Sequence, residues 1–465
     1  MVFLAVGLGG CMSLGELKTS TPVVAACWHA TLPHGGRSSE LLSWWASFKD
    51  PSLDELIQLA ETENAQIQKA VANIDKARAT LDSSRAGLSP SLDGSASVTR
   101  SGTMGGSANE VAALTSRSGG LDSRWEIDLF GKNKRQAEAA ASRAQGQVWS
   151  WHEARISVAA EVGDYDVQYR ACRQLERLYR DELASQRETI NVTEKSAQSG
   201  LISTSDLALA RASAATSSSN LTAQRANCEI IIKSLVQLTG GDEPVVRSLL
   251  KQGKGRIPQP SALRIASVPA EVLRQRPDIN ALEAEVAASI ADVGAAKADL
   301  YPSLSLSGSI SISASSVSGT SAPWSFGPAL SIPVLDGGSR RAAVRSAVAD
   351  YDLAVAGYKS GVLNAVGEVE TALIRVNTAL RRITDAKTAA DNYQSYFNSV
   401  DENWKSGGVS ILDREEARRS AQSAAITLIE IRRDAVQYWI ALYKSLGGGW
   451  SVTNPSVVAS INGKD

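Results

Sequence analysis

The second half of this 465-residue chain repeats the first half, so its fold must accommodate a doubled unit. Matching segments occur in the same order in both halves, as expected for an internal repeat. Two of the three pairs are separated by 207 positions and the third by 212. The pairs are GLSPSL at 87–92 with DLYPSL at 299–304, GLISTSDLALAR at 200–211 with GGVSILDREEAR at 407–418, and LVQLTGG at 235–241 with LYKSLGG at 442–448.

Each repeat contains a long segment that favours one continuous helix. Residues 132–199 and 339–406 contain no Pro and few Gly, and small apolar residues recur at mixed spacings of three and four. A helix of about 65 residues would be roughly 100 Å long, and it would need neighbouring helices along its whole length. We expect a tube of helices around an aqueous bore. The expected partner helices are 54–87, 204–238, 277–300 and 411–445.

Between the helices, the hydrophobic period changes to two, which predicts strands. Leu304, Leu306, Ile310 and Ile312 alternate with serines, so one face is apolar and the other is hydroxylic. Each segment has about 10 residues, the length that a tilted strand needs to cross a bilayer. Gly- and Ser-rich loops at 101–120 and 314–323 would close two hairpins. The expected strands are about 90–100, 121–130, 303–314 and 324–335.

Four strands are too few to close a barrel, because about eight is the smallest number observed. Three copies of the chain would supply twelve strands, with carboxylates and serines facing a water-filled lumen. The alternative is a soluble sandwich with one solvated face, which shows the same alternation. We favour the barrel, because this long chain has only four such strands and they adjoin very long helices.

Composition argues against several other classes of protein. The net charge of −1 gives no general electrostatic argument for nucleic-acid binding, and no apolar run is long enough for a transmembrane helix. The three histidines, His29, His34 and His152, lack a second ligand at metal-binding spacing. No phosphate-binding loop or nucleophile–base set is recognisable, so we expect no metal site and no enzymatic activity.

The first ten residues form a short apolar stretch that ends before Cys11. The box Leu8-Gly9-Gly10-Cys11 resembles the end of a bacterial lipoprotein signal, although a basic leading region is missing. This resemblance implies removal of residues 1–10 and covalent lipid on Cys11, which would hold the protein at a bilayer surface. The alternative is a buried apolar end.

Two further cysteines are placed symmetrically about a predicted turn. Cys172 lies 28 positions before Gly200 and Cys228 lies 28 positions after it, so an antiparallel helical hairpin brings them to nearly the same level. In an oxidising compartment they could form a disulfide. The alternative is two buried thiols that act as small apolar side chains.

Taken together, the chain resembles the TolC-like outer-membrane efflux channels, most closely the NodT-type lipoproteins of resistance-nodulation-division tripartite pumps. The resemblance spans nearly the whole sequence. The residues that carry it are Leu8-Gly9-Gly10-Cys11, Trp44-Trp45, Asp50-Pro51, WEIDLFG at 125–131, Arg276-Pro277-Asp278, Ala296-Lys297, Pro302-Ser303 and LGGGW at 446–450.

The resemblance implies that both hairpin turns point into the periplasm and that the second helps to close the duct. The family's gate pattern maps onto Trp404, Gly407, Glu416 and Arg419. Glu416 replaces the usual Asp, and Arg414 and Glu415 replace an aliphatic run. Glu416 and Arg419 share one helix face and could pair within or between subunits, although a solvated helix face would show the same spacing.

The tips are also expected to contact a periplasmic adaptor protein. The residues concerned are Gly200, Ser203, Asp206, Gly407 and Gly408. Helix capping alone would explain Ser203 and Ser205 at the first tip.

The predicted fold class is an α+β membrane protein with an internal two-fold repeat, in which a trimeric 12-stranded transmembrane β-barrel, four strands per chain, continues into a long periplasmic α-helical barrel. The predicted function is a passive outer-membrane exit duct for small toxic compounds, with an adaptor and an inner-membrane transporter as partners and no cofactor besides the lipid. A lipid-anchored coiled-coil scaffold or adhesin is the alternative. The predicted divisions are 1–10 (signal), 11–52 (lipidated lead), 53–240 (first repeat, with its hairpin at 132–240), 241–268 (linker), 269–446 (second repeat, with its hairpin at 339–446) and 447–465 (tail).

Overall fold

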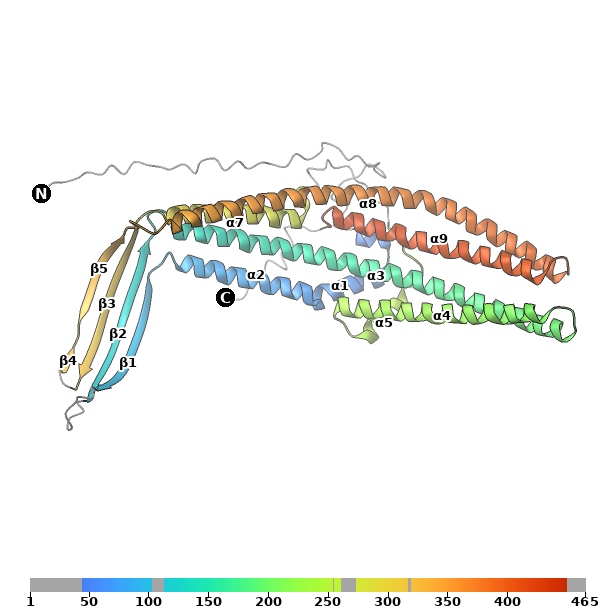
Figure 1. Cartoon of the computed structure of the whole chain (residues 1–465), viewed down its shortest axis with the longest axis horizontal. Helices are drawn as coiled ribbons and strands as arrows, with labels where there is room; N and C mark the ends of the chain where they lie inside the picture. The colour runs from blue at the N-terminus through green and yellow to red at the C-terminus, as the bar shows by residue number, and fades with distance from the viewer. Residues whose placement is uncertain (1–43, 103–112, 254, 261–272, 317–318, 450–465) are drawn as a thin grey trace. The chain divides into compact units, whose positions relative to one another are not determined.

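The structure is a computed structural model that describes residues 44–102, 113–253, 255–260, 273–316 and 319–449. Long helices alternate along the chain with pairs of strands, and these strands form one small antiparallel sheet (Figure 1). The same order of elements occurs twice. The elements are η2 (Trp45–Phe48), α1 (Pro51–Glu63), α2 (Ala65–Ala86), β1 (Ser91–Gly102), β2 (Ala113–Ile127), α3 (Lys132–Gln198), α4 (Thr204–Thr239), α5 (Glu243–Gln252), α7 (Pro277–Ala298), β3 (Ser303–Ser315), β4 (Gly319–Ser321), β5 (Trp324–Ser331), α8 (Ser339–Lys405) and α9 (Ile411–Ser445).

The described residues form two compact units. The first unit contains the described residues within 72–149 and 280–361, and it therefore includes the whole sheet. The second contains the described residues within 44–71, 150–279 and 362–449, and it therefore includes both helical hairpin turns. The long helices α3 and α8 contribute residues to both units. Within the described residues, no helix combines the length and hydropathy needed to cross a membrane.

In the first unit, the strands pair in the order β1, β2, β3, and β3 then pairs with β4 and β5 in succession. All of these pairings are antiparallel. β2 begins at Ala113, inside the segment that we expected to be a loop, because its Ser, Thr and Gly residues pair in register with both β1 and β3. β5 ends at Ser331, four residues before the expected end of that strand.

Small residues hold the helices of the first unit close together. Ala139 of α3 packs against Ala288 and Ala291 of α7 in a buried cluster. A Cβ on Gly146 of α3 would lie 3.4 Å from the Cβ of Ala284 of α7, which is ordinary contact distance. Polar side chains flank this seam, since Arg143 pairs with both Glu285 and Asp292. The Ala-rich pattern therefore serves close helix approach.

In the second unit, a single residue separates the helices that we expected to be continuous over 54–87. Asn64 ends α1, and its side-chain oxygen accepts hydrogen bonds from Gln66 and Ile67 at the start of α2. Its amide nitrogen donates to the carbonyl of Leu238 near the end of α4, at 2.6 Å. Asn64 thus caps the start of α2 and also satisfies a carbonyl group near the end of α4.

The lead before α1 packs on the last helix through aromatic rings. Trp44 stacks on Tyr443 of α9 with ring centroids 4.6 Å apart, and Phe48 meets Trp44 edge to face. Trp45 fits over Gly163 of α3, where a Cβ would lie 2.7 Å from its ring. Trp44 is therefore part of the core, and Trp45 is partly buried beside it.

Arg170 of α3 joins three segments of the second unit. It pairs with Asp50, which caps α1, and with Asp166 on its own helix. It also donates to the carbonyls of Gly253 and Arg256, after α5. A buried cation with this many acceptors is satisfied, and it fixes the lead and the linker against α3.

Candidate functional site

The two hairpin turns have the same construction. Gly200 and Gly407 have φ values of +68° and +79°, a left-handed conformation that favours glycine. Ser203 and Ser410 then begin the returning helices α4 and α9. Each serine forms a capping box, with Asp206 in the first turn and Asp413 in the second. The local sequence therefore dictates both turns. In the second turn, the backbone N–H of Gly408 also donates to the carbonyl of Asn403.

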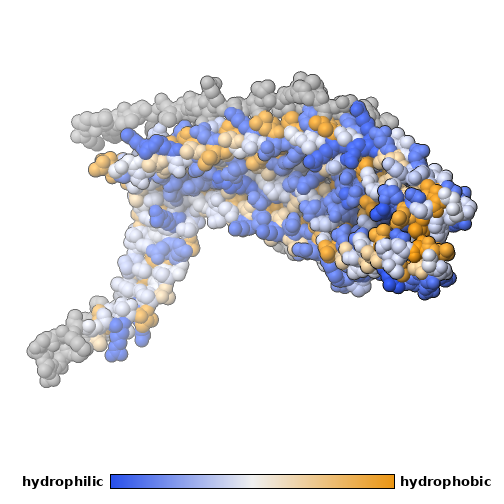
Figure 2. All heavy atoms as spheres, turned by 45° about the vertical axis from the view of Figure 1, so that its right-hand side comes forward, coloured by the Kyte–Doolittle hydropathy of each residue, from blue (hydrophilic) through white to orange (hydrophobic). Residues whose placement is uncertain are grey.

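Apolar side chains are exposed on and beside these turns. Leu201, beside Gly200, is 77% exposed, and Leu209 of α4 and Leu412 of α9 are also exposed. Figure 2 shows hydrophobic surface gathered at the end of the helical region that faces the viewer. A groove of about 300 Å³ lies between the hairpins beside the turns. It is lined by α3, α4 and α9, and its lining includes Asp206, Leu209, Leu412 and Glu416.

The predicted gate residues do not form one cluster. Arg419 and Glu416 pair along the surface of α9 at 2.5 Å, and their side chains are 65% and 68% exposed. Trp404, on α8, instead lies under the guanidinium of Arg414, 4.7 Å from the ring centroid. The acid–arginine pair therefore faces solvent in a single chain, whereas Trp404 belongs to a different set of contacts.

Seven polar residues near the turns connect α3, α8 and α9, and we call them the tip network. Arg414 reaches Asp401 of α8 at 2.5 Å, and Glu415 accepts hydrogen bonds from Gln186 and Thr189 of α3. Arg418 pairs with Glu415 at 2.6 Å and with Glu182 at 3.5 Å. The members are Glu182, Gln186, Thr189, Asp401, Arg414, Glu415 and Arg418.

The tip network contains three carboxylates and two arginines, and Lys405, which pairs with Asp401, supplies the third positive charge. Arg414 and Arg418 are each 6% exposed, yet their carboxylate partners are close. Burial raises the pKa of Asp401, but hydrogen bonds from Lys405 and Arg414 outweigh it and hold that pKa below its usual value. Sequence reasoning singled out Arg414 and Glu415 as unusual but did not identify their partners. These partners depend on which helices pack together.

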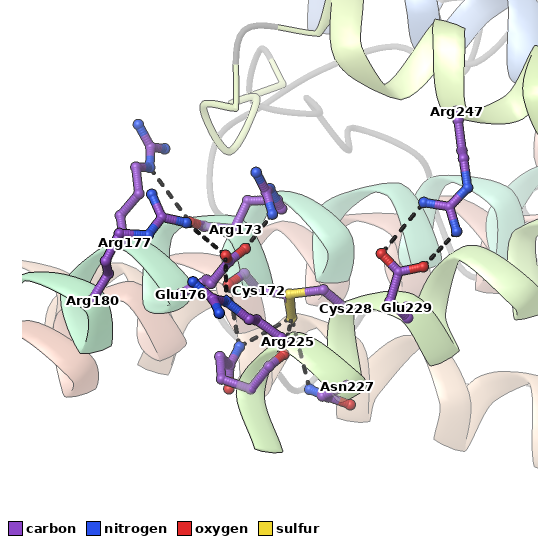
Figure 3. Close-up of a disulfide and its surroundings, with 11 residues drawn as sticks. Cys172, Arg173, Glu176, Arg177, Arg180, Arg225, Asn227, Cys228, Glu229 and Arg247 are labelled. Atoms are coloured by element: carbon purple, nitrogen blue, oxygen red, sulfur yellow. Dashed lines mark hydrogen bonds and ion pairs between the residues drawn. A yellow bond between two sulfur atoms is a disulfide. The ribbon is translucent and has the colours of Figure 1, made fainter. Parts of the chain in front are cut away.

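The structure joins Cys172 of α3 to Cys228 of α4 by a disulfide (Figure 3). Both side chains are buried, and Ile231, Tyr165 and Tyr169 pack around them. One turn further along α3, Glu176 pairs with three arginines, Arg173, Arg180 and Arg225, the last from α4. The bridge and this charge cluster fasten the first hairpin at one level.

Lipidation of Cys11 and the expected absence of a metal site stay predictions. Cys11, the proposed lipidation site, lies outside the described residues. Among the described residues, no group of three or more His, Cys, Asp or Glu side chains is arranged to hold a metal ion.

Comparison with known proteins agrees with this architecture. A family model described as outer membrane efflux protein matches residues 56–241 and 268–448, one match for each repeat. Nodulation protein T of Rhizobium leguminosarum bv. trifolii is 31% identical over 434 residues, covering 91% of this chain and 92% of the relative. The toluene efflux pump outer membrane protein TtgI of Pseudomonas putida is 28% identical, covering 97% and 98%.

A solved structure of the outer-membrane channel OprN superposes with a TM-score of 0.80. It is 28% identical, and the alignment covers 93% of this chain and 97% of that one. The doubled helical hairpins, the small sheet and the family match across both repeats lead to one conclusion: the chain belongs to the outer membrane efflux protein family.

Proposed function

We propose that three copies of this outer-membrane efflux protein form the exit duct of a tripartite pump and pass small toxic compounds to the exterior. The duct performs no reaction itself. A periplasmic adaptor protein and an inner-membrane resistance-nodulation-division transporter are the partners, and the transporter supplies the energy. The efflux names of several relatives and the fold shared with an outer-membrane channel support this assignment.

The observation that carries the trimer is the unfinished sheet. In the described part of the chain, β1 pairs only with β2, and β4 and β5 pair only with β3. Both edges therefore present unpaired backbone groups, which cannot face lipid without a partner. β4 and β5 follow one another along the same edge of β3 and count as one edge strand, so each chain contributes four. Edge-to-edge pairing of three copies satisfies these groups and closes twelve strands. The apolar face then meets lipid and the hydroxylic face lines the lumen.

The test is purification from outer-membrane fractions followed by mass measurement and planar-bilayer conductance. We expect a heat-stable trimer that conducts ions, and deletion should sensitise the cell to toxic compounds. A stable protomer without conductance would contradict the duct and favour the scaffold or adhesin.

At the tips, we propose that the turns bind the adaptor. The turn residues are Gly200, Ser203, Asp206, Gly407 and Gly408. The exposed Leu201 and the neighbouring groove support this role, because apolar surface beside polar caps suits a partner's helical hairpin. Replacing Leu201 with Ser should weaken adaptor crosslinking while trimer yield stays unchanged. Equal crosslinking in this variant would contradict the role.

For the gate, we propose that Glu416 and Arg419 form a ring of charge when three copies surround one axis, with Trp404 holding the helices behind it. The exposure of the pair supports this role, because both side chains are free to face a neighbour. Charge reversal in Glu416→Lys should raise the conductance of the closed channel. Unchanged conductance would refute the gate.

At the amino terminus, we propose that covalent lipid on Cys11 anchors the mature protein. Intact-mass analysis should show a mature chain that begins at Cys11 with acyl groups attached. Cys11→Ser should remove the acyl mass, whereas an unmodified Cys11 in the wild type would refute lipidation.

A further inference from the structure

The strand register places two arginines on the apolar face of the sheet. Residues that pair across antiparallel strands point to the same face. Arg117 of β2 pairs with Val98 of β1 and with Ala314 of β3, so it shares the face of those residues. Arg100 of β1 pairs with Thr115, two residues from Arg117, on the same face. The two arginines are therefore diagonal neighbours, about 7 to 8 Å apart between Cα atoms.

No acid lies on this face within the described strands. The carboxylates of the sheet, Asp93, Asp122 and Glu126, are on the opposite face: Asp93 pairs with Asp122, and Asp122 and Glu126 pair with serines of β3. The remaining residues of the apolar face are small or hydrophobic, and several are well exposed, with Val98 at 72% and Ile312 at 61%. Arg100 and Arg117 form no ion pair with another described residue. An anion from outside the chain would therefore pair favourably with these two neighbouring cations.

The arginines lie at one end of the apolar band. Along β3, ten residues separate Leu304, opposite Ile127, from Ala314, opposite Arg117. Ten residues of a strand tilted by about 40° rise roughly 25 Å, which is the height of the apolar band in outer-membrane proteins. Arg100 lies near the end of β1 and Arg117 near the start of β2, so both are at the hairpin end of these strands, at the level of lipid headgroups.

The same end of the sheet is hollowed. A shallow groove of about 380 Å³ runs across β1, β2 and β3 beside Arg117. It is hollow because small residues, Ala96, Gly119 and Ala314, replace the larger side chains found elsewhere on this face. The groove of small residues can hold an acyl chain, and the adjacent arginines can bind the anionic headgroup at the end of that chain.

We propose that Arg100 and Arg117 bind the phosphate of a phosphorylated glycolipid in the outer leaflet, with an acyl chain in the groove of Ala96, Gly119 and Ala314. The planar guanidinium groups can each donate two hydrogen bonds to phosphate oxygens. The proposal rests on the proposed function in one respect, since it requires that the apolar face meets lipid. It adds a ligand class and a site to that function.

The test is native mass spectrometry of the detergent-purified protein titrated with bisphosphorylated lipid A. Wild type should retain the lipid, and the double variant Arg100→Gln/Arg117→Gln should lose at least tenfold in affinity, because each charged hydrogen-bonding partner contributes about tenfold or more. Arg124→Gln is the matched control, because Arg124 is also an exposed strand arginine but lies on the polar face. It should bind as wild type does.

Two further arms identify the source of the phosphate. In the first arm, dephosphorylated lipid A is added to wild type, and it should bind as weakly as phosphorylated lipid A binds to the double variant. In the second arm, excess inorganic phosphate is added to the wild-type complex, and it should not displace the lipid. Equal lipid binding by wild type and the double variant would overturn the proposal, as would an equal loss in Arg124→Gln. Planar-bilayer conductance of the double variant is measured in parallel: it should be retained, whereas failure of the duct itself would abolish conductance in wild type.

Discussion

The guanidinium of Arg414 on α9 lies over the ring of Trp404 on α8, 4.7 Å from the centroid, while its Nε reaches Asp401 at 2.5 Å. One buried cation therefore joins both helices of the second hairpin close to its turn. Through Glu415, the same contacts reach Thr189 and Gln186 of α3 in the first hairpin. A polar network thus joins the two hairpins near their tips.

Replacing Arg414 with Met should loosen this end of the hairpins. The variant keeps much of the side chain's volume but removes the buried cation that joins Asp401 and Glu415. Asp401 keeps its pair with Lys405 and Glu415 keeps its pair with Arg418, so the expected cost is that of lost charged hydrogen bonds, about 2 kcal/mol. We expect faster proteolysis near residue 407 and a lower melting temperature, checked by limited proteolysis and thermal unfolding.

Arg419→Gln supplies the comparison for that experiment. Its pair with Glu416 is exposed, and such pairs contribute less than about 1 kcal/mol. Proteolysis as slow in Arg414→Met as in Arg419→Gln would show that the tip network does not hold the hairpins.

The disulfide between Cys172 and Cys228 should stabilise the first hairpin. The bridged residues are 56 positions apart, and closing a loop of this length restricts the unfolded chain by about 4 kcal/mol in the chain-entropy model. Reductant should therefore lower the melting temperature of wild type. The double variant Cys172→Ala/Cys228→Ala should melt at a lower temperature and show no further response to reductant. Maleimide labelling of both residues in unreduced, unfolded protein would contradict the bridge.

Asp166 should make stability depend on pH. Burial raises the pKa of this fully buried carboxyl to about 6, although the nearby Arg170 partly opposes the shift. A folded pKa above the unfolded value of 3.8 means that the folded state binds the proton more tightly. The stability of wild type relative to Asp166→Asn should therefore rise as pH falls from 7 towards 4, by up to about 3 kcal/mol. Denaturant unfolding at several pH values measures this difference, and a parallel response of both proteins would refute the assignment.

Gly240, at the end of α4, should tolerate no side chain. Its φ is +66°, and a Cβ would lie 2.6 Å from the carbonyl oxygen of Glu63. Gly240→Ala should cost more than the roughly 1 to 2 kcal/mol of a left-handed conformation alone, because α1 and α4 must also separate. Gly200→Ala is the matched variant, since Gly200 has φ +68° but open space around it. Equal melting temperatures for the two variants would show that the close approach to Glu63 is not limiting.

Much of the fold could be read from local signals. The ends of α4 and α9 match the expected 204–238 and 411–445 to within a residue, because capping boxes and turn glycines act over four or five neighbouring residues. The start of β2 could not be read in the same way. Its Ser, Thr and Gly residues resemble a loop, and only pairing with β1 and β3 makes them a strand.

The sequence by itself determined the internal repeat, the long helices, the two capped turns and the alternating strands, since each of these depends on residues close together in the chain. Tertiary structure alone decided that Trp404 meets Arg414 rather than Glu416, that Glu415 reaches Thr189, and that Arg100 and Arg117 share a face without an acid. The physical reason is that a helix or strand carries its own periodicity, whereas the partner of a polar side chain depends on which element packs beside it and in which register.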